Sequence, residues 1–158
     1  MISFDDTDER IISILSVDAR VSNREVARDI GISEAAVRKR LKRLANTGAA
    51  KISAVINPAA VGLEVAAFLR LQTAPSGARA VVENAAKLEC VSFAALTTGR
   101  FNVIVLVGVR NRAELAELVH THFRCWEGVH GIETIELVST AKHRLDLILI
   151  APPMPEDE

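Results

Sequence analysis

The first third of the chain repeats apolar residues at intervals of three and four, which is the period of amphipathic helices. Asp5 or Asp6 can cap a first helix. The apolar face of this helix is formed by Ile11, Ile12, Ile14 and Leu15. A second helix is expected to begin at Ser22, which precedes Glu25 in the spacing of a capping box. Gly31 is expected to end it, because glycine readily adopts the left-handed conformation that follows a last helical turn.

A third helix is predicted directly after the second, because only Ile32 separates Gly31 from the next capping residue, Ser33. Gly48 ends this helix. Its buried face is formed by Val37, Leu41 and Leu44. Two helices joined by so short a turn have the layout of a helix-turn-helix, in which the second helix lies in the major groove of DNA.

The third helix, SEAAVRKRLKRLANTG at residues 33–48, is strongly basic. Five of the six residues from 38 to 43 are Lys or Arg, whereas Glu34 is its one acid. Two interpretations are open, a helix that contacts DNA or a solvated charged face. Solvated faces usually mix both signs, so charge and spacing together favour DNA contact. The expected DNA-binding residues are Ser22, Ser33, Glu34, Ala35, Ala36, Arg38, Lys39, Arg40, Lys42 and Arg43.

The segment after Gly48 is expected to link two domains. Residues 51–57, KISAVIN, alternate enough to predict a strand, which Pro58 would end. A strand directly after a helix-turn-helix would make a minimal wing. The predicted organisation is a helix-turn-helix domain at 1–50, a strand and hinge at 51–63, a second domain at 64–151 and a flexible tail at 152–158.

The second domain repeats strands and helices. Strands are predicted at 65–73, 91–97, 102–109, 132–139 and 145–150, and helices at 78–88 and 112–124. The order is βαββαβ with one extra strand, which is typical of a ferredoxin-like sandwich with both helices on one sheet face. The apolar run at 104–107 predicts that the other face is buried too, most simply by a second subunit. The fold class is therefore α+β: an N-terminal winged helix-turn-helix joined to a C-terminal ferredoxin-like βαββαβ sandwich.

Composition is typical of a globular protein, and we expect no membrane span. The 158 residues are 49% hydrophobic and 25% charged, with a net charge of −1. Residues 1–57 hold ten Lys or Arg against eight Asp or Glu, and residues 58–158 hold nine against twelve. No apolar run approaches the length of a membrane-spanning helix, and the acidic N-terminus is unlike a signal peptide. Cys90 and Cys125 are expected to be buried free thiols, so we predict a cytoplasmic protein without a membrane partner.

The chain resembles the Lrp/AsnC family of leucine-responsive and asparagine-responsive regulators. The resemblance rests on residues 19–48, which match its helix-turn-helix, and 51–63, which match its strand and hinge including Asn57-Pro58. Residues 97–107 and 127–138 fall where its effector-domain motifs fall. The resemblance implies a bacterial or archaeal transcriptional regulator that binds double-stranded DNA at a promoter operator. It also implies dimers that assemble into octamers, and a small amino acid bound in a cleft between dimers.

One departure from the family concerns the effector loop, which in the family reads Gly-Asp-Tyr/Phe-Asp. Here both acids are replaced, by Arg100 and Asn102, and an arginine suits a ligand carboxylate. Three interpretations stay open: a different choice of ligand, a contact between dimers, or no ligand at all. The resemblance implies effector-binding residues Thr98, Gly99, Arg100, Phe101, Asn102 and Thr134.

Two rival functions also stay open. Some tetrapyrrole decarboxylases resemble this family in fold, but they carry histidine and tyrosine in their active regions, and this chain has no tyrosine. A co-regulator that does not bind DNA would not need the basic helix. His122 and Cys125 could share a helical face, but two ligands are too few for structural zinc. We therefore expect no catalytic activity, no cofactor and no metal.

Overall fold

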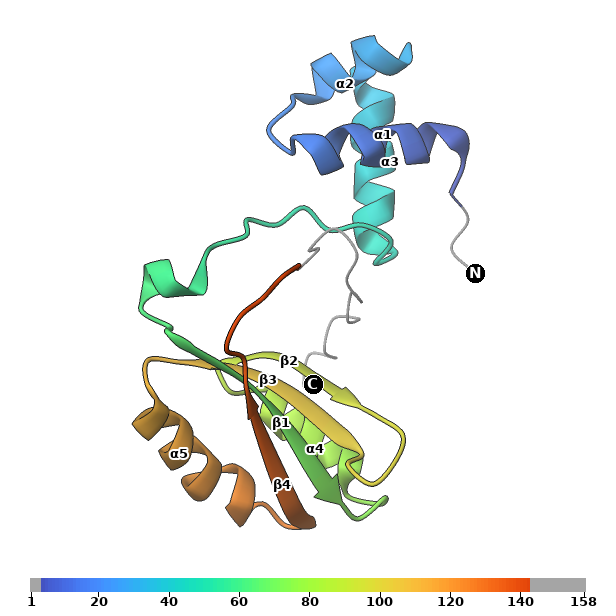
Figure 1. Ribbon diagram of the computed structural model, residues 1–158. Coiled ribbons are helices and arrows are strands. Elements are labelled where there is room, and N and C mark those ends of the chain that lie inside the picture. The colour runs from blue at the N-terminus through green and yellow to red at the C-terminus, as the bar shows by residue number, and fades with distance from the viewer. Residues whose placement is uncertain (1–3, 143–158) are drawn as a thin grey trace. The chain divides into compact units, whose positions relative to one another are not determined.

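The computed structural model describes residues 4–142, and they form two compact units that divide between Ala54 and Val55. The first unit is helical and the second is built on a β-sheet (Figure 1). Each unit has its own hydrophobic core.

Three helices form the first unit: α1 (Asp6–Val17), α2 (Asn23–Ile30) and α3 (Glu34–Asn46). Asp5, Ser22 and Ser33 cap them, and the first two are members of full capping boxes. Gly31 ends α2 in the left-handed conformation with φ +78°, as its position predicted. The core contains Ile11, Val26, Ala27 and Val37. The predicted helix-turn-helix is confirmed.

The predicted wing strand is wrong. Residues 51–57 have no regular secondary structure, and they lead into the short 3₁₀ helix η1 (Pro58–Val61). The apolar side chains of Ile52, Val55 and Ile56 are more than half exposed. A strand exists only when another strand accepts its hydrogen bonds, and the described residues offer this segment no partner. The alternation in the sequence is real, but it does not by itself make a strand.

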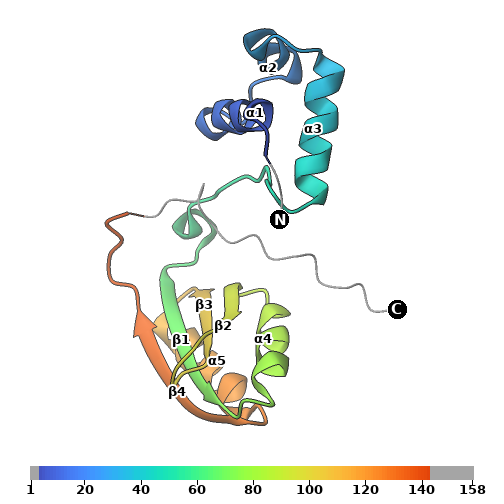
Figure 2. The same ribbon diagram turned by 90° about the vertical axis from the view of Figure 1, so that its right-hand side faces the viewer.

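The second unit contains a four-stranded antiparallel sheet with the strand order β2-β3-β1-β4. Its strands are β1 (Val65–Thr73), β2 (Val91–Leu96), β3 (Val103–Val109) and β4 (Val129–Glu136). Its helices are α4 (Ala78–Ala86) and α5 (Arg112–Thr121), and the 3₁₀ helix η2 (Phe123–Cys125) follows α5. The predicted βαββαβ order is confirmed (Figure 2). The extra strand predicted at 145–150 lies outside the described residues.

Some predicted boundaries differ from the structure. Both helices are shorter than predicted, and β4 begins three residues earlier. At the start of α4, Gly77 occupies the N-cap position without a side-chain hydrogen bond. The thiols are less buried than expected: Cys90 is partly buried and Cys125 is exposed.

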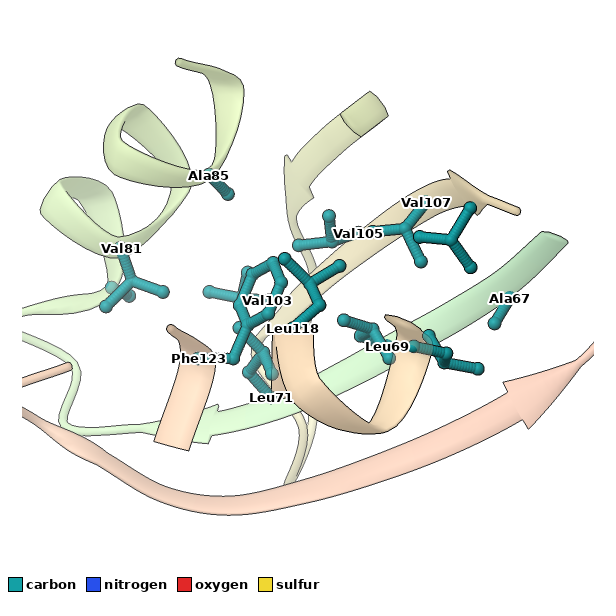
Figure 3. Packing of buried hydrophobic residues seen from close by; sticks show 13 residues of the cluster. Ala67, Leu69, Leu71, Val81, Ala85, Val103, Val105, Val107, Leu118 and Phe123 are labelled. Carbon is teal, nitrogen blue, oxygen red and sulfur yellow. The ribbon is translucent and has the colours of Figure 1, made fainter. Parts of the chain in front are cut away.

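Alternate residues of the two central strands point toward the helices and form the main core (Figure 3). The buried residues of β1 and β3 are Ala67, Leu69, Leu71, Val103, Val105, Val107 and Val109. They pack against Val81 and Ala85 of α4, Leu118 of α5, and Phe123. Because side chains alternate across a strand, the intervening residues lie on the other face, which neither α4 nor α5 covers. We call this second surface the open sheet face.

Candidate nucleic-acid interface and effector loop

The outer side of α3 carries a ridge of exposed residues. Ala35, Lys39 and Lys42 follow one another at intervals of four and three, so they share one face of the helix. Val37 and Leu44 are buried on the opposite side, which places the ridge away from the core. Neither lysine forms an ion pair with any residue between 4 and 142. The two lysines are therefore available to an anionic partner, and Ala35 beside them leaves room for its close approach.

Arg38 lies beside this ridge and is paired to an acid of the same helix. Its Nη2 donates to Oε1 of Glu34 over 2.6 Å, and both side chains are well exposed. Exposed ion pairs at this spacing contribute only a few tenths of a kcal/mol. Arg38 can therefore leave Glu34 for another acceptor, such as DNA, at about that cost in free energy. Arg38 also lines a shallow groove with Lys42 and with Asn23 of α2. The sequence had not indicated Asn23.

The first turn of α3 is capped by its own N-terminal serine. The Ser33 hydroxyl accepts a hydrogen bond from the backbone N–H of Ala36 over 3.2 Å. Ser22 does the same for α2, where its hydroxyl accepts from the N–H of Glu25 and donates to the Glu25 carboxylate. Both serines are exposed, as a role at a DNA surface requires. Their side chains already have protein partners that fix the helix starts.

The other two basic residues of α3 are held by α1. The Asp8 side chain is fully buried, and its carboxylate accepts hydrogen bonds from Arg40 over 2.9 Å and from Arg43. Arg40 also donates to Asp5 over 2.6 Å. We call Asp5, Asp8, Arg40 and Arg43 the α1–α3 clamp. The sequence placed both arginines at the DNA surface, and it gave no indication of the two aspartates as their partners.

The clamp sets the charge state of its acids. Burial of Asp8 would raise the pKa of its carboxyl, but the hydrogen bonds from Arg40, the Asp5 backbone and Arg43 outweigh it and hold that pKa below the ordinary value of 3.8. Hydrogen bonds from Arg40 and from the Asp8 backbone lower the pKa of Asp5 in the same way. Both acids are therefore ionised at neutral pH, as ion pairing with two arginines requires.

The effector loop connects β2 to β3 and is closed by hydrogen bonds at its base. The N–H of Thr97 donates to the carbonyl of Asn102 over 2.9 Å, and the Thr97 hydroxyl donates to the carbonyl of Phe101 over 2.8 Å. Gly99 has φ +105°, a conformation that suits glycine. Thr98, Gly99 and Arg100 are exposed at the tip. The loop is thus a short turn closed by hydrogen bonds at its base.

Two guanidinium groups flank the ring of Phe101. Arg70 on β1 lies 4.7 Å from the ring centroid and Arg100 lies 5.6 Å from it, both within the range of cation–π contact. Arg70 is paired with Glu133 of β4 over 2.7 Å, whereas Arg100 reaches only the amide oxygen of Gln72, over 3.4 Å. The site therefore has two cations for one acid. Arg70 and Gln72 had not been indicated by the sequence.

Thr134 does not join this group. It is paired in register with Leu69, which faces the helices, while its neighbours on β4 pair with Arg70 and Phe68. Directly opposed residues of an antiparallel pair lie on the same side of the sheet. Thr134 is thus on the helix side, and the Arg70, Arg100 and Phe101 group lies at the other face. Within one chain the structure brings the loop residues together without Thr134.

The described residues hold no group of three or more His, Cys, Asp or Glu side chains that could bind a metal ion. Among the described helices, none has the length and apolar character needed to cross a membrane.

A helix-turn-helix followed by a ferredoxin-like sandwich defines a two-domain DNA-binding regulator, and comparisons with known proteins identify the family. Residues 4–45 match the AsnC-type helix-turn-helix domain, and residues 66–147 match the Lrp/AsnC ligand binding domain. An HTH-type transcriptional regulator of Pyrococcus abyssi is 34% identical over 142 residues, covering 89% of this chain and 90% of the relative. The chain belongs to the Lrp/AsnC family of transcriptional regulators.

Solved structures agree on the fold. E. coli AsnC superposes with a TM-score of 0.80 at 19% identity, covering 90% of this chain and 97% of AsnC. A transcriptional regulator of Neisseria meningitidis, solved as its L-Met complex, superposes with a TM-score of 0.79 at 22% identity, covering 92% of this chain and 97% of its own. The α+β class and the order of the two domains are therefore confirmed.

Proposed function

We propose that this regulator recognises an operator sequence through α3, with Ala35, Arg38, Lys39 and Lys42 at the centre of the contact. The observation that carries the proposal is the exposed ridge of α3, where a short side chain is followed by two lysines on the side opposite the buried face. Small residues allow close approach to base edges, and lysines suit phosphates. Ser22, Ser33, Glu34 and Ala36 lie at the two helix starts and complete the proposed surface.

We propose further that a small molecule with a carboxylate, such as an amino acid, modulates this binding at the effector loop. The ligand-binding domain match and the L-Met complex of the Neisseria regulator support a ligand of this class. Arg100 has no acidic partner among the described residues, and its guanidinium can bind a carboxylate through two parallel hydrogen bonds. Phe101 and Asn102 support the loop, while Thr98 and Gly99 form its exposed tip. Thr134 can take part only from a neighbouring surface.

A second copy of the chain is proposed to cover the open sheet face. Phe93, Ile135 and Leu137 are each exposed by more than a third, although they are large and apolar. Phe68 and Leu106 lie in register with them at the centre of that face. Burying apolar area is the main driving force of association. The dimer would also present two copies of α3 to two half-sites, and the family resemblance implies assembly as far as an octamer.

We propose that the protein regulates transcription without catalysing a reaction, and that it acts in the cytoplasm, where the chromosome is accessible. The experiment is a titration of the full chain onto the DNA upstream of its own reading frame, followed by fluorescence anisotropy. A random-sequence duplex serves as the control, and each titration is repeated with a pool of the twenty amino acids. Preference for the upstream DNA supports the operator proposal, and a shift of the curve with the pool supports the effector proposal. Equal binding to both duplexes would contradict the first, and no shift would contradict the second.

A further inference from the structure

Asp8 is the only charged side chain that is fully buried among residues 4–142. It lies in the first turn of α1. A buried carboxylate is strongly unfavourable unless cations and hydrogen-bond donors compensate it. Here the compensation comes from α3, through Arg40 and Arg43, and from the backbone N–H of Asp5 over 3.2 Å.

This arrangement commits two bases of α3 to the protein itself. Moving Arg40 or Arg43 onto a DNA phosphate would leave the buried carboxylate of Asp8 with one cation fewer, which costs free energy. An exposed lysine can contact a phosphate without this cost. Arg40 is shared between Asp8 and Asp5, so it would break two ion pairs. Lys39 and Lys42 have no such partner among the described residues and lie on the ridge that faces outward.

The contacts of the clamp also fix the position of α3. Arg40 and Arg43 are one turn apart on α3, and both reach a single carboxylate on α1. A helix held at two points along its length can neither slide nor rotate relative to the carboxylate without breaking one of them. The apolar core of Ile11, Val26 and Val37 holds the helices together. Because apolar contacts are not directional, they fix the rotation of α3 about its axis less strictly than the two ion pairs do.

We propose that Asp8 is a positioning residue for DNA recognition: it holds Arg40 and Arg43 so that α3 presents Lys39 and Lys42 to the phosphates, while the two arginines themselves stay off the DNA. The proposal rests on the proposed function of α3. In this proposal Arg40 and Arg43 position α3 instead of contacting DNA. Recognition then also depends on Asp8, an acid that does not touch DNA.

The first test measures how the binding constant for a random-sequence duplex depends on salt, which needs no known operator. The slope of log K against log salt is negative, and removing one phosphate contact reduces its magnitude by about one. Lys42→Gln should therefore make the slope less steep by about one. Arg43→Gln removes the same charge one residue away and should leave the slope unchanged. A change of the Lys42→Gln size for Arg43→Gln would overturn the proposal.

The second test concerns Asp8 itself, with Asp6→Asn as the matched control, because Asp6 lies in the same helical turn and is exposed. Asp8→Asn should reduce the preference for upstream over random DNA by about fivefold or more, the size of a coupling between contacting residues. Asp6→Asn should leave that preference intact. A folded Asp8→Asn protein with the wild-type preference would overturn the positioning role.

A chain that binds no DNA would refute the proposed function, and the clamp is then tested by unfolding in urea. Asp8→Asn should shift the urea midpoint less in the Arg43→Gln background than in the wild type, because the two residues share one interaction. Additive shifts would overturn the clamp, whether or not the protein binds DNA.

Discussion

The side chain of Asn102 forms a two-way hydrogen-bonded pair with the backbone of Thr73. Its Oδ1 accepts from the Thr73 N–H over 2.9 Å, and its Nδ2 donates to the Thr73 carbonyl over 3.1 Å. Thr73 ends β1, where the register with β4 shifts between Gln72 and Thr73. An amide can donate and accept at once, whereas a carboxylate can only accept. The asparagine that departs from the family pattern therefore fits its own surroundings better than an aspartate would.

Asn102→Asp should consequently destabilise the second unit. It removes the donor to the Thr73 carbonyl and places a negative charge beside that oxygen, so we expect the free energy of unfolding to fall by about 1–2 kcal/mol. Trp126, the one tryptophan, packs edge-on to Phe123 in this unit, so its fluorescence during urea unfolding reports the change. Asn84→Asp, which adds the same charge on an exposed position of α4, is the control. Equal stability of the two variants would refute the pairing argument.

Arg100 is predicted to serve the effector rather than DNA. Arg100→Ala should weaken the response of DNA binding to the amino-acid pool by about tenfold in pool concentration, because a charged hydrogen-bonded contact is worth about 1.5–3 kcal/mol. Binding without the pool should not change. Arg79→Ala, on the exposed surface of α4, is the control.

The same variant separates the two roles considered for Arg100. A changed sedimentation coefficient with a normal response would indicate a contact between copies of the chain instead of a ligand contact. If response and assembly both stay as in the wild type, neither role is correct.

The α1–α3 clamp predicts acid sensitivity of the first unit. The pKa of Asp8 in the folded protein is below 3.8, so the unfolded chain takes up a proton first as the pH falls. The stabilising contribution is thus fully present above about pH 5 and is lost as the pH drops through the folded pKa. Circular dichroism of the helices during urea unfolding should show a stability that is flat from neutral pH to about 5 and then declines. Asp8→Asn should flatten that decline, and an unchanged decline would contradict the assignment.

The open sheet face predicts that association of two chains is sensitive to charge. Ile135→Lys places an ammonium group on a surface that the dimer would bury, so the dimer should dissociate into monomers in sedimentation experiments. Ala116→Lys adds the same charge on an exposed position of α5 and should leave the dimer intact. An Ile135→Lys protein that remains dimeric would show that copies associate through another surface.

Local patterns in the sequence were sufficient to predict the helices and most strands. Ser22 and Gly31 define the limits of α2 through chemistry within a few residues. The apolar segments of β1 and β3 predict strands, and the structure buries alternate residues of each. The strand predicted at 51–57 failed because a strand depends on a partner elsewhere, which periodicity does not contain.

The candidate sites were less predictable, because their key contacts join distant parts of the chain. The sequence predicts all five bases of α3 as DNA contacts, yet Arg43 pairs with an acid 35 residues earlier. In the same way, Arg70 approaches Phe101 only because β1 and β3 are neighbours in the sheet. Thr134 was assigned by family resemblance, and the strand register shows that it lies on the other side of the sheet. The residue types indicated the chemistry of each site, whereas the partner of each side chain could be identified only from the fold.

The most direct test of the account is the salt dependence of DNA binding by the double variant Lys39→Ala and Lys42→Ala. These two lysines form the charged part of the ridge on α3, and each is expected to replace one counterion on a phosphate. The account predicts that the slope of log K against log salt, which is negative, becomes less steep by about two relative to the wild type, on any DNA sequence. A double variant with the wild-type slope would show that α3 does not lie against the phosphates, and the proposed interface would be wrong.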